Sequence, residues 1–294
     1  MRRDLSERLE STILSSRAVK SLVGPIDGGL NRIFGSGPLR HVKLLLNGSW
    51  LGHPLHPLLT DVPVGAWTAA ILLDLLALVF HMPTGRASSV AVGLGVAAAL
   101  AAACAGVMDW IDVNPPEKAV GAVHAALNTT ATVLFLVSLV IRGKHAGHAT
   151  PSAFVVALAG YLVLSLGAFL GGAMVYRMGV MINRNAYRSG PEEFLSALAS
   201  AELSDGALRR VMVGEEPVLL VRREEQIFAV GAVCSHYGAP LEEGKIMDGT
   251  IQCPWHASRF ALEDGRVREG PACAPLPAYD VRVAGGQVQV RRRA

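Results

Sequence analysis

The sequence predicts an α-helical four-helix transmembrane bundle followed by an all-β domain. Four consecutive stretches are apolar for about 20 residues each, enough to cross the hydrocarbon core of a bilayer. Downstream of them the composition becomes mixed, with short alternating apolar runs that are typical of strands. Four such apolar runs in succession are uncommon in a soluble helical bundle, which is the alternative. The four predicted spans are Leu58–Phe80, Ser88–Trp110, Val120–Ile141 and Ala153–Tyr176.

The composition divides the chain into four parts. We expect an N-terminal interfacial helical segment over residues 1–48 and the four-helix transmembrane domain over 49–180. A linker over 181–204 would then lead to the β domain over 205–294. The N-terminus lacks the apolar core of a signal peptide. Its apolar residues follow a helical period, and this helix could pack on its own domain or lie on the membrane surface; they are Leu5, Leu9, Ile13 and Leu14.

Four crossings place both ends of the bundle on the same side of the membrane. The links between the spans are short and contain Pro or Gly, as turns between antiparallel helices should. Lys and Arg are more frequent on the side of the chain ends, which predicts a multi-pass protein of the cell membrane with its N-terminus and β domain in the cytoplasm. That side carries Arg40, Lys43, Lys118, Arg177, Arg184 and Arg188, and the other side carries Arg86, Arg142 and Lys144.

A weak internal repeat relates the two halves of the membrane domain. The first and third spans begin with similar segments, His56–Thr60 and His124–Asn128. The second and fourth spans end similarly, with Gly106–Trp110 and Gly172–Tyr176. Either the domain contains two copies of one helical hairpin, or the similarity is chance among apolar segments. A real repeat would give His56 and His124 equivalent positions.

The charge and the cysteine content argue against two classes of protein, nucleic-acid-binding proteins and disulfide-stabilised proteins. The net charge is +3 and the basic residues are scattered, so nothing indicates nucleic-acid binding. The four cysteines do not form a disulfide framework, because two lie in one motif, Cys104 lies in an apolar span and Cys273 has no obvious partner.

That motif consists of two short boxes, each with one cysteine and one histidine. Cys234-Ser-His236 and Cys253-Pro-Trp-His256 are separated by 16 residues. Two thiolates on one iron and two imidazoles on the other describe a Rieske-type [2Fe–2S] cluster. Zinc also accepts two Cys and two His, but zinc fingers usually pair cysteine with cysteine and histidine with histidine. The alternation favours the iron–sulfur cluster, with Cys234, His236, Cys253 and His256 as its ligands.

Over about residues 205–290 the chain resembles the Rieske family. The resemblance implies a small antiparallel β domain with two cluster-binding loops at one tip, covered by a proline-rich loop that Gly270–Pro275 matches. The alternation of apolar residues agrees with strands. The predicted strands are Val218–Arg222, Ile227–Val230, Gly249–Cys253, Tyr279–Val283 and Gln287–Val290.

Details of the boxes bear on the reduction potential. Respiratory members of the family carry a disulfide between the boxes, and the corresponding positions here look like Ala239 and Trp255. Ser258 matches a serine that hydrogen-bonds near the cluster, but Phe260 stands where a tyrosine would donate. Fewer hydrogen bonds toward the sulfurs lower the potential, so we expect a low, ferredoxin-like potential. Ala257 replaces a common glycine.

Polar residues gather at the end of the membrane domain that should lie near the β domain. His53 and His56 each precede a proline, which restrains the segment. The stretch from Trp50 to Trp67 resembles an uncharacterised four-helix membrane family marked by this His-Pro-Leu-His-Pro box, over about residues 35–180. That family is found fused to Rieske domains and brings no established chemistry. The polar residues are His53, His56, Asp61, Asp109, Asp112, His124 and Asn128.

Ionisable groups within a membrane are costly and often functional. His56 and His124 could ligate haem b, the His and Asp groups could bind a non-haem metal, or the histidines, His53 included, could hydrogen-bond a quinone. Alternatively these groups cap helices and bond one another. Asp74, deeper in the first span, is expected to pair with a polar group on another helix, or to serve a proton path.

Together these features predict a membrane-anchored electron-transfer protein, an oxidoreductase component with no catalytic acid–base pair. The cluster would pass single electrons between a cytoplasmic protein partner and a membrane site, haem or quinone. A redox sensor or an anchoring subunit of a larger complex is the alternative, and oligomers are possible. A complete Rieske oxygenase is not expected, because it needs a further iron-binding domain and only a short segment follows His256.

Overall fold

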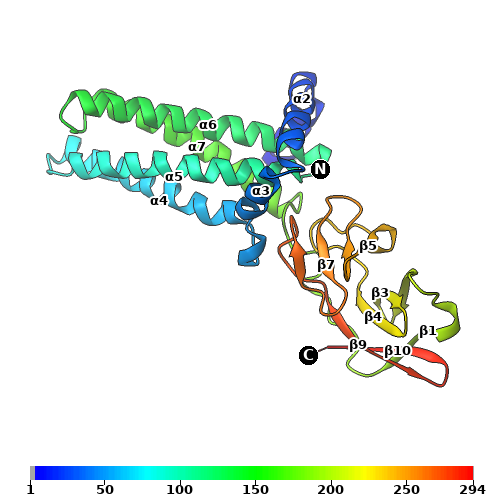
Figure 1. Ribbon diagram of the computed structural model, residues 1–294. Coiled ribbons are helices and arrows are strands. Elements are labelled where there is room, and N and C mark those ends of the chain that lie inside the picture. Colours follow the sequence, from blue (N-terminus) through cyan, green and yellow to red (C-terminus); the bar gives the residue numbers. More distant parts are fainter. Residues whose placement is uncertain (1–3, 294) are drawn as a thin grey trace. The chain divides into compact units, whose positions relative to one another are not determined.

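The computed structural model describes residues 4–293 and divides into two compact units. The first unit is helical and comprises the chain up to Asn47 together with Leu55–Val180. The second comprises Gly48–Pro54 and the chain from Met181 onward, and it is mainly β (Figure 1). The α-helices are α1 (Leu5–Ser15), α2 (Arg17–Phe34), α3 (Leu39–Asn47), α4 (Leu55–Val79), α5 (Gly85–Ile111), α6 (Pro115–Lys144) and α7 (Pro151–Tyr176).

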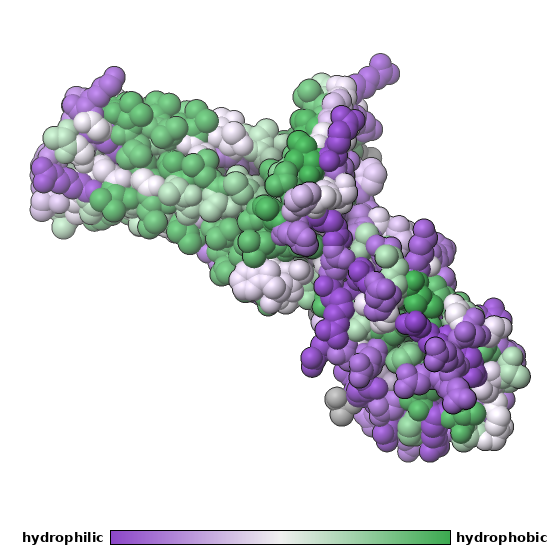
Figure 2. Space-filling model, viewed as in Figure 1, coloured by the Kyte–Doolittle hydropathy of each residue, from purple (hydrophilic) through white to green (hydrophobic). Residues whose placement is uncertain are grey.

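Helices α4 to α7 are the four expected transmembrane spans, and each is long and apolar enough to cross a bilayer. Each begins two to five residues earlier than its apolar run, because flanking Gly and Pro residues suit the first helical turn. Large apolar side chains cover the outside of these helices (Figure 2), and Val90, for example, is 72% exposed. A soluble bundle would bury such residues, whereas lipid solvates them.

The internal repeat is present in the packing of the bundle. Positions 68 residues apart on α4 and α6 meet in pairs along the core. Trp67 stacks on Phe135 with ring centres 4.1 Å apart and planes 6° apart. Asp74 binds Arg142 toward one end of the helices, and the rings of His56 and His124 lie 6.3 Å apart toward the other.

Helices α5 and α7 repeat with a spacing of 65 residues. Gly95 on α5 faces the Trp67 ring and Gly160 on α7 faces Phe135, and a Cβ at either glycine would crowd that ring. Gly106 and Gly171 face His56 and His124 in the same way. The alignment of Gly106 with Gly172 in the sequence is therefore wrong by one residue, because many small residues here allow several alignments.

Asp74 has the pairing role that we expected for it. Its carboxylate accepts hydrogen bonds from Arg142 and from Ser88, whose Oγ lies 2.5 Å away. Ser138 lies 3.2 Å from Nε of Arg142. Arg142, which the count of basic residues assigned to the side opposite the chain ends, is fully buried in this network.

The N-terminal helices are bound to the bundle by buried ion pairs. Lys43 on α3 donates to Asp112 at 2.6 Å, and Asn47 donates to Asp109 at 2.8 Å. Lys118 on α6 binds Asp27 on α2 at 2.5 Å. Burial raises the pKa of Asp112, and the nearby Lys43 opposes that shift. Asp109 and Asp112 therefore bind residues of α3, and the structure shows no hydrogen bond between either of them and the described polar residues that the sequence grouped with them.

Two antiparallel sheets form the core of the second unit. One sheet has the order β1-β10-β9-β4-β3-β2 and the other has the order β5-β6-β7-β8. All five predicted strands are present as β3, β4, β6, β9 and β10. The strands are β1 (Leu195–Ala199), β2 (Leu208–Val213), β3 (Glu216–Arg223), β4 (Gln226–Gly231), β5 (Lys245–Met247), β6 (Thr250–Gln252), β7 (Arg259–Ala261), β8 (Val267–Glu269), β9 (Ala278–Ala284) and β10 (Gln287–Arg292).

The segment 181–204, which we expected to be a linker, contributes to the β domain. Its strand β1 pairs with β10 at the edge of the larger sheet. The run Leu195-Ser-Ala-Leu-Ala has weak strand propensity, because Ala and Ser lack the branched side chains that strands favour. The pairing with β10 makes it a strand, which the sequence alone did not indicate.

Candidate metal centre

Two loops with the same backbone geometry carry the Cys/His boxes. The first loop follows β4, and in it Cys234 N donates to Ala239 O at 2.9 Å and Gly238 N donates to Cys234 O at 2.9 Å. The second follows β6, where Cys253 N donates to Ser258 O at 2.8 Å and Ala257 N donates to Cys253 O at 3.2 Å. Each loop therefore turns back on itself and presents its Cys and His on one side.

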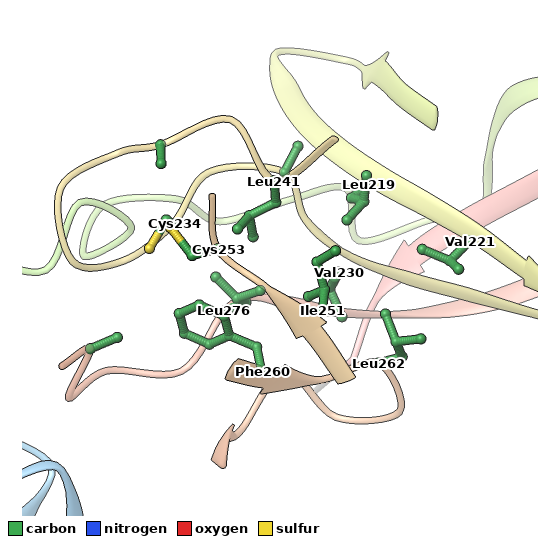
Figure 3. Packing of buried hydrophobic residues seen from close by; sticks show 13 residues of the cluster. Leu219, Val221, Val230, Cys234, Leu241, Ile251, Cys253, Phe260, Leu262 and Leu276 are labelled. Atoms are coloured by element: carbon green, nitrogen blue, oxygen red, sulfur yellow. The ribbon is translucent and has the colours of Figure 1, made fainter. Parts of the chain in front are cut away.

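The two loops bring like residues together. The rings of His236 and His256 lie 5.0 Å apart at 84°. The thiols of Cys234 and Cys253 are close enough to share a hydrogen bond, and Figure 3 shows them side by side at one end of the domain core. One pair of thiolates and one pair of imidazoles is what a [2Fe–2S] cluster with two ligands per iron requires.

This arrangement differs from that of a single-ion site. A zinc ion takes four ligands around one centre, whereas each iron of the cluster takes only a pair from the protein. The residues present therefore fit the two-iron group.

The sulfur positions are buried and surrounded by backbone N–H groups. Cys234 and Cys253 are 1% and 3% exposed. The hydrogen bond from Cys234 lowers the pKa of the Cys253 thiol, and the N–H groups of Trp255 and His256 act in the same direction. The shared hydrogen bond and burial raise the pKa of Cys234. N–H groups directed at thiolate sulfur also stabilise a reduced cluster.

The proline-rich loop is tied to both cluster loops by serine hydroxyls. Ser235 Oγ donates to Ala274 O at 2.6 Å, and Ala272 N donates to Ser258 Oγ at 2.9 Å. Ser258 is fully buried and its hydrogen bond to the backbone holds the covering loop. Sequence reasoning missed Ser235, although its position between the two predicted ligands Cys234 and His236 is a signal that could have found it.

Of the residues expected to lower the potential, Phe260 and Ala239 are buried and Trp255 is exposed. Phe260 on β7 is fully buried, and Figure 3 shows its ring on the side of the core where the two cysteines lie. Ala239 is buried and Trp255 is 51% exposed, so the positions of the respiratory disulfide hold an alanine and a surface aromatic ring.

The three histidines considered for haem or quinone are not grouped together. His53 belongs to the second unit, where it lines a cavity of about 180 Å³ with Ser235, His236 and Cys273. His56 and His124 are neighbours in the first unit. Asn128 lies beside His124, and Asp61 is on the exposed face of α4. The predicted polar cluster is therefore divided into separate sites.

The paired loops define a class of protein, namely iron–sulfur electron carriers with mixed Cys and His ligation. Residues 193–280 match the family model of the Rieske [2Fe–2S] domain, and residues 52–184 match a predicted membrane protein family, DUF2231. The ferredoxin component of biphenyl 2,3-dioxygenase from Rhodococcus jostii is 33% identical over 92 residues, which cover 31% of this chain and 86% of that protein. The chain belongs to the Rieske [2Fe–2S] family, with a DUF2231 membrane domain preceding the cluster domain.

Two further relatives match over about a third of this chain. Human apoptosis-inducing factor 3 is 36% identical over 90 residues, but the match spans 31% of this chain and only 15% of that protein. The solved ferredoxin of carbazole 1,9a-dioxygenase from Nocardioides aromaticivorans is 28% identical, with a TM-score of 0.33, and the match covers 34% of this chain and 98% of that one.

Proposed function

We propose that Cys234 and Cys253 bind one iron of the cluster, and that His236 and His256 bind the other. The observation that carries this assignment is the pairing of like ligands at the tip of the two loops. Bound there, the cluster would accept and release one electron at a time. The chain's own residues exclude water, hold the covering loop and direct N–H groups at the sulfurs.

We propose further that the cluster exchanges electrons with a protein partner. Two of the relatives are named as the ferredoxin component or subunit of a dioxygenase. Trp255 lies between the ligands Cys253 and His256 and is the exposed aromatic residue of the second box. Exposed aromatic residues anchor protein interfaces, so Trp255 supports docking of the partner beside the histidine ligand.

The other end of the electron path lies in the membrane domain in this proposal. Four helices that can span a bilayer hold a histidine pair among apolar residues, and buried ionisable groups in membranes usually serve a function. The cluster domain and the N-terminus would face the cytoplasm. Because Arg142 is buried in an ion pair, the side of the bundle away from the chain ends carries fewer free positive charges. This strengthens the charge bias that supports a cytoplasmic N-terminus.

The N-terminal helices fit an interfacial position. Apolar residues of α2 recur on one face and remain exposed, among them Leu22 at 64% and Ile26 at 52%. Basic residues lie on the same helix, at Arg17, Lys20 and Arg32. Such a helix suits the boundary between headgroups and acyl chains, and this supports a peripheral helical segment over residues 1–48.

Stopped-flow reduction tests the electron-transfer role. The full chain in detergent is mixed with a reduced flavin-dependent ferredoxin reductase, and the cluster absorbance is followed. We expect rapid reduction, at least about tenfold slower in Trp255→Ala because a hot-spot residue contributes 2 kcal/mol or more. Val283→Ala, an exposed apolar residue on β9, is the matched control. A cluster that no protein donor reduces, although dithionite does, would favour the anchoring or sensing alternative.

A further inference from the structure

We propose that His56 and His124 bind one haem b group, one histidine on each face, through their Nε2 atoms. The inference rests on the proposed function, because it names the membrane site with which the cluster would exchange electrons. It starts from the repeat, in which two equivalent hairpins each contribute one histidine to the core of the bundle.

The hydrogen bonds fix the same tautomer in both rings. Nδ1 of His56 lies 2.8 Å from the carbonyl oxygen of Ala102, and Nδ1 of His124 lies 2.8 Å from that of Gly167. A carbonyl oxygen only accepts, so each Nδ1 carries the proton and each Nε2 keeps its lone pair. The amide nitrogen of Asn128 lies 3.3 Å from Nε2 of His124, so this contact would give way to the iron. Metal-binding histidines are commonly oriented in this way, by donation from the second nitrogen to a backbone carbonyl.

Glycines on the neighbouring helices hold the rings in place. A Cβ at Gly106 would lie 2.8 Å from Cε1 of His56, and one at Gly171 would lie 3.0 Å from Cε1 of His124. Each ring is therefore packed directly against the backbone of the neighbouring helix. The glycine that it contacts follows, by four residues, the residue whose carbonyl oxygen it binds. Both ligands are preorganised by the same two contacts, a backbone carbonyl and a glycine of the neighbouring helix.

The separation of the rings fits a shared metal. Two imidazoles bound on opposite sides of one ion by bonds of about 2.0–2.1 Å have ring centres roughly 6 Å apart. The observed ring centres are 6.3 Å apart, with planes at 83°. That distance lies toward the far end of the range for two aromatic rings in direct contact.

The ligand set selects haem among the candidates. Among the described residues no third His, Cys, Asp or Glu joins the pair, so a bare ion would have only two protein ligands. A porphyrin supplies the four remaining nitrogens, and the facing helices of bundles commonly bind such cofactors. A quinone oxygen needs a hydrogen-bond donor, whereas these rings already donate their protons to backbone carbonyls. Haem iron would change by one electron between ferric and ferrous, which matches the one-electron change of the cluster.

Optical and paramagnetic resonance spectra of the full chain test the proposal. The protein is purified in detergent from cells supplied with a haem precursor, and apoprotein is titrated with hemin. We expect one haem per chain with the low-spin spectrum of two imidazole ligands. His56→Ala and His124→Ala should each lower haem content at least about tenfold. His145→Ala, an exposed histidine at the end of α6, should leave it unchanged.

Two further measurements keep the result decisive. His124→Met retains a ligand of similar size, so it should bind haem with an altered spectrum even if the alanine variants fold poorly. The cluster signal is recorded in each sample. Haem-free protein after hemin titration, or an unchanged haem spectrum in the double variant His56→Ala/His124→Ala, would overturn the inference.

If the cluster is still reduced in haem-free protein, the electron-transfer role stands without the haem. A haem protein without a reducible cluster would instead support the haem site and contradict the electron-transfer role.

Discussion

Asp74 and Arg142 form an ion pair in which both side chains are 0% exposed. They occupy equivalent positions of the two hairpins, 68 residues apart, and each is the other's charge partner within the apolar helices. Elsewhere in the core the equivalent positions hold similar residues, but here one holds an acidic residue and the other a basic one. The pair joins α4 to α6, which are not adjacent in the sequence.

Breaking this pair should destabilise the bundle strongly. Arg142→Ala leaves the Asp74 carboxylate buried without its partner, which costs about 3–5 kcal/mol. Arg142→Leu combined with Asp74→Leu removes both charges and should recover most of the loss. The free energy of unfolding in mixed detergent micelles measures this, with exposed Asp61→Asn as the control. Additive losses in the double variant would contradict the pairing.

Ala257→Gly should stabilise the cluster domain. Ala257 has φ of 58°, in the left-handed region, and it occupies the same place in its loop as Gly238, with φ of 80°. An L-residue with a Cβ pays about 1–2 kcal/mol there. We expect a gain of about 1 kcal/mol in the free energy of unfolding of the holoprotein. The control is Ala239→Gly in the first loop, next to Gly238, where φ is not left-handed. This variant should lower the free energy of unfolding, and equal effects of the two variants would refute this account.

Phe260→Tyr should raise the reduction potential of the cluster. The added hydroxyl would supply a donor on the side of the core where the cysteines lie. A hydrogen bond of about 1 kcal/mol to the reduced form corresponds to roughly 40 mV for a one-electron couple. Potentiometric titration followed by electron paramagnetic resonance measures the shift. Phe228→Tyr, a partly buried ring packed on the same core, is the control.

Ser258→Ala should loosen the covering loop. The variant leaves the N–H of Ala272 without the acceptor that lies 2.9 Å away, and such a loss costs about 1–3 kcal/mol when the group is buried. We expect lower thermal stability of the holoprotein and faster loss of iron to a chelator. Ser196→Ala on the exposed edge strand β1 should change neither the thermal stability nor the rate of iron loss. Identical iron loss in both variants would show that Ser258 does not hold the loop.

The sequence was sufficient for most of the architecture, because it depends on strong and local signals. Apolar runs of membrane length located α4 to α7, and alternation located β3, β4, β6, β9 and β10. Short strands such as β5 and β7, three residues each, escaped because three residues carry too little alternation, although both pair with β6 nearby in the sequence. The boxes around Cys234 and Cys253 carried the ligand prediction through residue type and spacing alone.

What the sequence left open depends on tertiary contacts. It could not separate His53 from His56, three residues apart, although one lines a cavity of the second unit and the other lies in the helical bundle. Nor could it show that Arg142 binds Asp74, because the weak repeat gives the two residues equivalent positions but does not predict a contact between them. The role of Ser235 required the hydrogen bond to Ala274, far along the chain.

The central claim is that two cysteines and two histidines ligate one [2Fe–2S] cluster. The most direct test is electron–nuclear double resonance of the dithionite-reduced full chain with ¹⁵N-labelled histidine. Our account predicts strong couplings from two histidine nitrogens, with one lost in His256→Cys and both retained in His53→Ala. A cluster signal without histidine couplings, or purified protein that contains zinc and no iron, would contradict it.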